Sequence, residues 1–270
     1  MRRAGHLAGG VVGVLALVCA SMAQAQTKEA EPGLTIFGWT VSARASVQVS
    51  PDYLGSKTYS TGPTLSLQFH RPGHQSSFHG ADDSPDLQLV GDKTLSGGVV
   101  LRGRSSRDDD GDLQGVHKID FALEPGVYAE WWPADGLRLR GEARHGAMGN
   151  SAWSGDVAAD LVHDDGKWVL SIGPRLHLGD SRFTRTYFDI TALDAARSPF
   201  GISAYGKDGA FVSWGALASA EYRWSPRWSL LGDVRYQRLM GDAADSPIVA
   251  QLGSPNQVRA AVGVRYRFGR

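Results

Sequence analysis

Hydrophobic and polar residues alternate strictly along the last stretch of this chain, residues 258–268. One parity holds only apolar side chains, namely Val258, Ala260, Val262, Val264, Tyr266 and Phe268. The other parity holds arginine, alanine and glycine. Successive side chains of a β-strand point to opposite faces of its sheet, so this pattern predicts a strand with one apolar and one cationic face. Such a strand suits either a soluble sandwich or a wall between lipid and a wet interior.

The same alternation recurs along most of the chain. It predicts twelve strands, at residues 39–50, 65–69, 76–81, 85–90, 95–104, 119–132, 137–145, 153–163, 168–178, 210–224, 228–239 and 258–268. The patterns at 76–81 and 85–90 are weak, and without them ten strands remain. No window keeps the 3.6-residue period of an amphipathic helix, so we expect little helix.

The connections between these segments fall into two classes. Residues 132–136, 163–167 and 224–227 form tight turns rich in Pro, Gly and Asp, whereas residues 52–62, 105–118, 180–207 and 241–256 are long and polar. Tryptophan and tyrosine gather near the strand ends, as in an interfacial girdle. These features predict an all-β, transmembrane antiparallel β-barrel with short periplasmic turns and long extracellular loops. A soluble periplasmic β-protein is the alternative.

The N-terminus has the pattern of an export signal. Met1-Arg2-Arg3 precedes an apolar run that ends near Ala20, and Ala23 and Ala25 form an A-x-A cleavage site before Gln26. We expect a cleaved signal peptide at 1–25, a short polar segment at 26–38 and a barrel at 39–270, located in the Gram-negative outer membrane. The single cysteine, Cys19, lies inside the signal, so the mature chain has no disulfide framework.

The charge balance of the mature chain excludes some partners. Removing Arg2 and Arg3 from the 28 basic residues leaves 26, against 28 acidic residues. A nucleic-acid binder would show a clustered basic excess, so we expect no nucleic-acid partner. No mature segment reaches the roughly 18 consecutive apolar residues of a transmembrane helix. Lipid would therefore have to be crossed by a barrel, in which all backbone groups are hydrogen-bonded.

Charges of both signs recur on the polar parity of the strands. In a barrel they would line the lumen, and the set comprises Arg44, Arg102, Asp120, Glu124, Arg138, Arg140, Glu142, Arg144, Asp156, Asp160, Arg175, Glu221, Arg223, Asp233, Arg235, Arg259 and Arg265. They would form either a salt-bridged filling or the lining of a narrow polar channel. Twelve strands enclose more space than side chains alone fill, so we expect some water inside, although the loop 180–207 could block passage.

The familiar catalytic and cofactor spacings are absent, since the chain has no H-E-x-x-H, G-x-S-x-G or P-loop motif. We expect His70, His74 and His79 to be solvated loop residues rather than metal ligands. We expect the acidic stretch 107–112 to be an exposed anionic loop, because it departs from the EF-hand spacing. The sequence thus predicts no enzyme, no cofactor and no metal site.

Several short motifs resemble the MipA/OmpV family of Gram-negative outer-membrane proteins, and together they span essentially the whole mature chain. The first loop carries Pro51, Tyr53, Gly55 and Ser56 in the spacing P-x-Y-x-G-S. Later loops carry Thr186, Tyr187 and Phe188, and then Gly241, Asp242, Asp245, Ser246 and Pro247. The last strand ends in the aromatic residues Tyr266 and Phe268, although Gly269 and Arg270 follow where family members commonly stop.

The resemblance implies a scaffold rather than an enzyme. The family's named member brings together a lytic transglycosylase and a penicillin-binding protein that synthesises murein, which implies the same partners here. It also implies contact with outer-membrane lipid, and with the barrel-assembly machinery that reads the terminal aromatic signal. The contact surface would be the turns 133–136, 164–167 and 225–227. The alternatives are a porin-like channel for small polar solutes and an adhesin that acts through the outer loops.

Overall fold

The computed structural model describes residues 40–70 and 78–268 of the chain. The expected signal peptide with Ala23, Ala25 and Gln26, the segment 26–38, and His74 lie outside these residues. Among the described residues, no helix is both long and apolar enough to cross a lipid bilayer.

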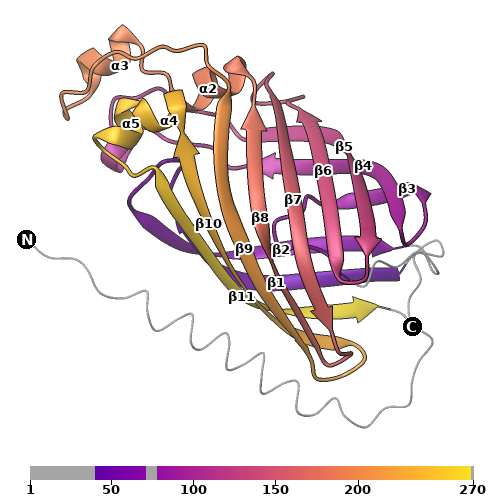
Figure 1. Ribbon diagram of the computed structural model, residues 1–270. Helices are drawn as coiled ribbons and strands as arrows, with labels where there is room; N and C mark the ends of the chain where they lie inside the picture. The colour runs from indigo at the N-terminus through magenta and orange to yellow at the C-terminus, as the bar shows by residue number, and fades with distance from the viewer. Residues whose placement is uncertain (1–39, 71–77, 269–270) are drawn as a thin grey trace, which may run out of the picture.

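Eleven strands in this part of the chain form one antiparallel sheet, which curls around an interior (Figure 1). The strands are β1 (Thr40–Pro51), β2 (Tyr59–His70), β3 (Asp86–Gly91), β4 (Leu95–Arg104), β5 (Ala122–Ala134), β6 (Leu137–His145), β7 (Trp153–Asp164), β8 (Trp168–Gly179), β9 (Phe211–Arg223), β10 (Trp228–Met240) and β11 (Asn256–Phe268). Their order in the sheet is β2-β1-β11-β10-β9-β8-β7-β6-β5-β4-β3. Nearly all neighbours are therefore consecutive hairpins, as the sequence predicts.

The pairing of the first and last strands closes most of the wall. Val41 lies opposite Phe268, and the register continues without a shift to Val49 opposite Ala260. On its other side β11 pairs with β10, with Trp228 opposite Tyr266. Both neighbours of the last strand are those that the barrel interpretation requires, so this prediction is confirmed.

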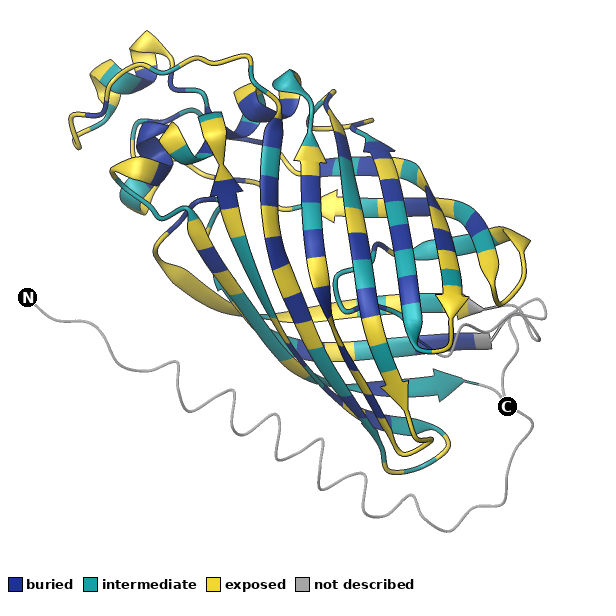
Figure 2. Cartoon of the chain, viewed as in Figure 1, coloured by how far each residue is buried: buried dark blue, intermediate teal, exposed yellow. Residues whose placement is uncertain are grey.

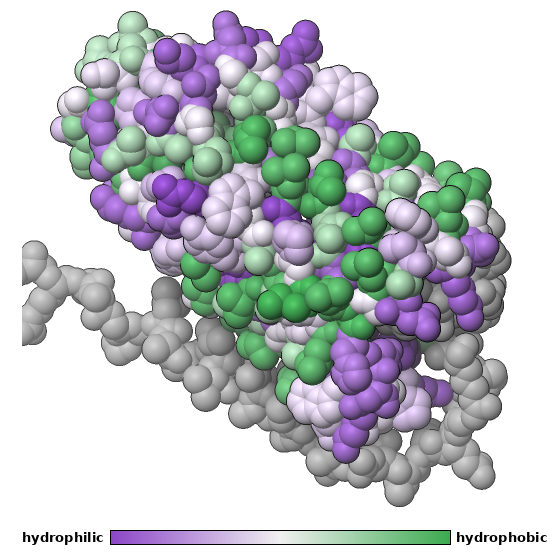
Figure 3. All heavy atoms as spheres, viewed as in Figure 1, coloured by the Kyte–Doolittle hydropathy of each residue, from purple (hydrophilic) through white to green (hydrophobic). Residues whose placement is uncertain are grey.

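Apolar side chains cover the outer face of the sheet and charged side chains cover its inner face, which is the reverse of a water-soluble protein. Leu65 is 76% exposed and Leu161 is 63% exposed, whereas Arg138 and Glu124 are completely buried. Burial alternates along the strands in Figure 2, and Figure 3 shows an apolar band across the middle of the molecule between hydrophilic ends. An apolar outside and a charged inside are stable when lipid covers the outside, because a charge costs far less among counter-ions than in hydrocarbon.

The expected strand count of twelve is wrong for the described residues, which hold eleven. Residues 78–81, part of the predicted strand 76–81, form no strand, and the next predicted strand is the short β3. The sheet edges β2 and β3 are not joined by ladder hydrogen bonds. The physical reason lies in the residues before β3, since Asp82 and Asp83 bind arginines of the barrel interior and draw this segment off the wall.

The two ends of the barrel differ, as the connection lengths predict. One end, which we call the turn end, carries tight turns such as Asp164–Trp168, where Asp165 Oδ1 accepts hydrogen bonds from the amides of Lys167 and Trp168. The other, the loop end, carries four short helices (Figure 1), namely α2 (Ser181–Phe188), α3 (Ala192–Arg197), α4 (Gly241–Asp245) and α5 (Pro247–Ala250). A 3₁₀ turn, η1 (Gly111–Leu113), lies in the loop after β4.

The loops at this end pack into a cap with a conventional apolar core. Its centre is formed by the fully buried rings of Phe183, Phe188 and Phe211, with Ile248 and Val249 from α5 beside them. Phe188 stacks on Phe211 with ring centroids 5.6 Å apart. Burial of large aromatic rings stabilises the cap in the way that it stabilises a soluble domain. The long polar loops therefore become a folded cap over the barrel mouth.

Candidate functional site

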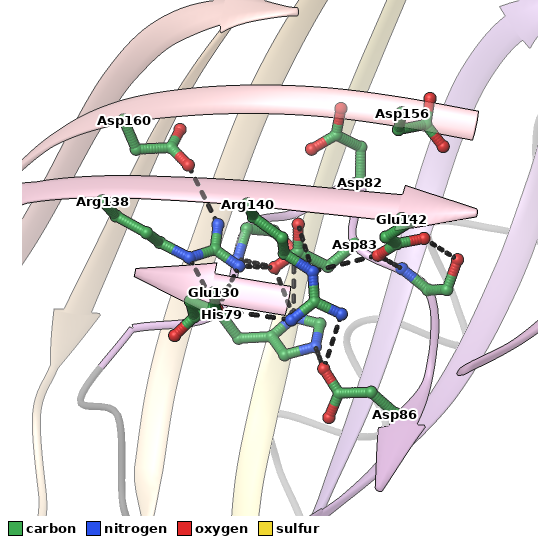
Figure 4. A network of polar contacts seen from close by, with 12 residues as sticks. His79, Asp82, Asp83, Asp86, Glu130, Arg138, Arg140, Glu142, Asp156 and Asp160 are labelled. Carbon is green, nitrogen blue, oxygen red and sulfur yellow. Dashed lines mark hydrogen bonds and ion pairs between the residues drawn. The ribbon is translucent and has the colours of Figure 1, made fainter. Parts of the chain in front are cut away.

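The barrel interior contains a dense network of ion pairs centred on β6. Arg138, Arg140, Glu142 and Arg144 follow one another at every second position of this strand, so all four side chains point inward. Arg138 donates from Nε to Glu130 Oε2 and from Nη1 to Asp160 Oδ2, each at 2.9 Å. Figure 4 shows how carboxylates from neighbouring strands converge on Arg138 and Arg140.

The segment that precedes β3 lies inside the barrel and is fixed to several walls. Asp82 accepts from Arg175 Nε at 3.0 Å, while its backbone carbonyl accepts from Arg102 Nη2 at 2.7 Å. Asp83 accepts from Arg138 Nη2, and Ser84 Oγ donates to Glu142 Oε2 at 2.6 Å. Three separate strands, β4, β6 and β8, thus hold residues 82–84, which makes this segment an internal plug.

His79 belongs to this plug and not to a solvated loop. Its side chain is only 12% exposed, and its Nε2 lies 3.6 Å from Asp86 Oδ2. The expectation of a solvated histidine fails here because the plug carries it among buried carboxylates. His70 has no described side chain and His74 lies outside the described residues, so the expectation for these two histidines is not tested. No group of three or more His, Cys, Asp or Glu side chains among the described residues is placed to hold a metal ion.

Most side chains of the expected lumen set lie on the interior face of the sheet and bind one another. Arg44 and Arg259 both approach Asp233, Arg265 pairs with Glu221, and Arg102 and Arg144 both bind Asp156. Arg223 lies at the turn end, where it bonds Asp164. Asp120 differs from the expectation, because it is exposed and precedes β5.

The strand pattern also places Glu130 and Arg104 on the inward parity of their strands, and both belong to the interior network. Sequence reasoning missed three other members of this network. No such signal existed for Asp82, Asp83 or His79, because the plug has no period. Only their contacts with distant arginines identify them.

A second interior feature, the loop-end pocket, lies between the plug and the cap and has a volume of about 490 Å³. Four arginines line it, Arg104, Arg107, Arg235 and Arg259. Tyr53 and Tyr187 add aromatic rings, and the remaining lining is mostly serine and glutamine, namely Ser50, Ser60, Ser105, Ser106, Gln237 and Gln257. Asp52 is the single carboxylate among its lining residues. The pocket is therefore strongly cationic.

The loops that carry the sequence motifs meet directly above this pocket. Tyr53 donates its hydroxyl to the carbonyl of Ile248 at 3.3 Å, and the amide of Gly55 donates to Gln257 Oε1 at 3.1 Å. Ser246 Oγ donates to the carbonyl of Phe188 at 2.6 Å. Burial raises the pKa of Tyr53 to about 12, so its hydroxyl stays a donor at neutral pH. Motifs spread over three loops thus support one another in the cap.

The acidic stretch of residues 107–112 divides between two environments. Asp108 is exposed and binds Lys118 at 3.3 Å, as expected of a surface loop. Arg107 is buried, and its guanidinium donates to the carbonyls of Tyr187 and His117 at 2.7 and 3.4 Å. Burial lowers the pKa of Arg107 to about 10, since the electrostatic attraction of Tyr53 and Asp194 offsets only part of the cost of desolvation.

Comparisons with known proteins extend these observations. A model of the family described as MltA-interacting protein MipA matches residues 44–268. A search of curated proteins finds no match. Among solved structures, the COG4313 outer membrane channel of Pseudomonas putida F1 is similar with a TM-score of 0.46 and 12% identity, over 90% of this chain and 100% of that one.

Two further solved structures show weaker similarity to the chain. The NanC porin gives a TM-score of 0.39 at 8% identity, over 84% of this chain and 98% of that one. The outer membrane protein OprG of Pseudomonas aeruginosa gives 0.30 at 12% identity, over 86% and 97%. The family match covers nearly all of the described strands.

Proposed function

The chain belongs to the family described as MltA-interacting protein MipA, and we propose that it is a non-enzymatic outer-membrane scaffold that tethers murein enzymes. In this proposal the β-barrel is the membrane anchor, with its turn end in the periplasm and its cap outside the cell. The partner is a lytic transglycosylase, as the family's description suggests, together with a penicillin-binding protein. The exported chain would reach the outer membrane after loss of residues 1–25.

The observation that carries this proposal is the internal plug. Arg102, Arg138 and Arg175 reach from three strands to residues 82–84, and the Arg138 side chain is completely buried. A solute would have to displace several buried ion pairs to pass, and breaking one such pair costs about 3–5 kcal/mol. A barrel filled in this way offers its partners a rigid surface rather than an aqueous channel.

The surface that we assign to the partner enzymes is formed by the tight turns of the turn end. It includes the turns 133–136, 164–167 and 225–227 and also the turn between β3 and β4, where Lys93 is exposed. Asp135 is likewise exposed, and Trp224 stacks on Trp228 with ring centroids 6.1 Å apart. Charged rims beside rigid aromatic rings are typical of protein contact surfaces.

Co-purification from outer membranes with matched charge-reversal variants tests the proposal. The turn-end variant K93E/D135R changes two exposed side chains, and the loop-end variant K57E/D109R makes the same two exchanges at exposed positions on the opposite end. We expect the turn-end variant to recover several-fold less transglycosylase than the wild type, because rim charges steer association. The loop-end variant should recover as much as the wild type. Equal recovery of the enzyme by both variants, or no recovery by the wild type, would contradict the scaffold.

A further inference from the structure

The loop-end pocket holds more positive charge than the protein neutralises. Among its four arginines, Arg104 has the shortest contact with a carboxylate, since Glu124 Oε1 lies 2.6 Å from its Nε. The guanidinium of Arg104 also lies over the Phe183 ring, 4.8 Å from its centroid. Arg104 is thus part of the wall, and the other three arginines carry the excess charge.

Arg235 and Arg259 face each other across the β10–β11 ladder at the same register position. Like charges directly opposite on paired strands are destabilising, so this arrangement costs stability unless another group compensates. The carboxylates near them are weak partners. Asp82 Oδ2 lies 3.6 Å from Arg235 and also binds Arg175. Asp233 Oδ2 lies 3.5 Å from Arg259, while Asp233 Oδ1 binds Arg44.

Arg107 adds a third cation from the opposite side of the pocket. It is 8% exposed, and its hydrogen bonds go to backbone carbonyls rather than to a carboxylate. The Nε atoms of Arg107, Arg235 and Arg259 are all buried without a hydrogen-bond acceptor among the described residues. Buried donors are normally paired, so these three Nε–H groups around one cavity are available to an acceptor that enters it.

The other residues that line the pocket indicate the chemistry of the uncharged part of a ligand. Serine and glutamine side chains surround the cavity, and the tyrosine rings supply flat apolar surfaces. Hydroxyl and amide groups with aromatic faces suit a hydroxylated molecule, and a volume of about 490 Å³ suits a small one. Ser60, Ser105 and Ser106 are exposed as well as lining the pocket, so a solute can reach it.

We propose that the loop-end pocket binds a small hydroxylated organic anion, whose carboxylate or phosphate group lies among Arg107, Arg235 and Arg259. Guanidinium groups recognise both anions through paired N–H donors, and the protein has already desolvated these donors. The anion also removes the repulsion between Arg235 and Arg259. This binding site is independent of the murein-enzyme scaffold at the turn end.

Equilibrium titration of the folded, detergent-solubilised barrel tests this proposal. The probes are glucuronate, glucose 6-phosphate and uncharged glucose, which separate a carboxylate from a phosphate and both from the sugar body. We expect at least one anion to bind ten or more times more tightly than glucose, and the affinity to fall as sodium chloride is added. Stronger binding of glucuronate would identify a carboxylate ligand, and stronger binding of glucose 6-phosphate a phosphate ligand.

The variant R235Q/R259Q should lose at least tenfold in affinity for the preferred anion. The matched control is R238Q, which removes an exposed arginine from the same strand β10. R238Q should bind within twofold of the wild type. Removing two repelling charges should not unfold the barrel, and a far-ultraviolet circular dichroism spectrum checks this. Anions that bind no better than glucose, or that bind R235Q/R259Q as tightly as wild type, would overturn the proposal.

Discussion

Arg138 on β6 and Asp160 on β7 form an ion pair in which neither side chain has any exposed surface. The donor Nη1 lies 2.9 Å from Asp160 Oδ2, and the two residues occupy the same register position of the β6–β7 ladder. Arg138 also binds Glu130 and Asp83, so one cation holds three carboxylates from two strands and the plug. This pairing links the wall of the barrel to the segment that fills it.

Replacing Arg138 with methionine should destabilise the barrel strongly. The substitution leaves buried carboxylates without their counter-ion, which costs about 3–5 kcal/mol when one partner of a buried pair is removed. Urea unfolding of the barrel in lipid vesicles measures the change. The control R182M alters an exposed arginine of α2 and should stay within about 0.5 kcal/mol of wild type. A loss from R138M as small as that of R182M would show that the network contributes little.

Neutralising the plug should open the barrel interior to ions. The variant D82N/D83N removes the charges that bind Arg175 and Arg138. We expect the wild type to give almost no steady current in planar lipid bilayers, because the plug stays fixed, and the variant to give a clear conductance. The control D109N/D135N neutralises two exposed aspartates and should behave as wild type. A wild-type barrel that conducts as well as D82N/D83N would remove the main support for a closed scaffold.

Replacing Gly55 with alanine should loosen the cap. Gly55 has φ of +100°, and an added Cβ would lie 2.5 Å from Val249 Cγ2. The left-handed backbone alone costs an alanine roughly 1–2 kcal/mol, and the clash adds to that. Faster trypsin cleavage after Lys57, an exposed residue of this loop, reports the change.

A second substitution separates the two causes in the Gly55 prediction. The variant V249A removes the methyl group that would clash, so G55A/V249A should lose less than the sum of the two single variants. Strict additivity would show that the backbone conformation, and not the contact with Val249, makes glycine necessary here.

The N-terminus of α3 should weaken at low pH. Asp194 accepts from His117 Nδ1 at 2.8 Å and from the amide of Thr191 at 2.9 Å. Burial raises the pKa of Asp194, but the hydrogen bonds from His117 and Thr191 outweigh burial and hold the pKa below its ordinary value of 3.8. Because the folded pKa is depressed, the ionised cap stabilises α3 fully above that value, and the effect disappears as pH falls through the folded pKa.

Hydrogen exchange of the α3 amides between pH 6 and pH 2.5 measures this dependence, after correction for the intrinsic rates. Protection in the wild type should fall in the acidic part of the range. The variant D194N cannot ionise and should show lower protection at pH 6 with little change on acidification. A wild-type profile as flat as that of D194N would assign the stability of α3 to packing alone.

Much of the fold followed from local pattern. The alternation over residues 258–268 placed Val262 outward and Arg265 inward, and the structure has Val262 57% exposed and Arg265 buried against Glu221. Short turns at one end and long loops at the other also followed from Pro, Gly and Asp at the turns. These features are local, because a two-residue period and a turn preference depend on neighbours in the chain.

The plug and the pocket could not be predicted in this way. Asp82 and Asp83 carry no period, and the partner Arg175 lies more than 90 residues away in the chain. The excess charge of the pocket likewise depends on which arginines have a carboxylate within reach. Arg104 has Glu124, whereas the guanidinium of Arg107 donates to backbone carbonyls.

The sequence by itself determined the direction of each strand's side chains, because alternation in a barrel assigns every residue to lipid or to the interior. The tertiary structure decided how the interior is used. It turned a predicted twelfth strand into a plug and folded the polar loops into an apolar cap. Beneath that cap it left Arg107 without a carboxylate, and Arg235 and Arg259 with only weak ones. Those outcomes depend on distances between residues far apart in the chain, which only the curled sheet brings together.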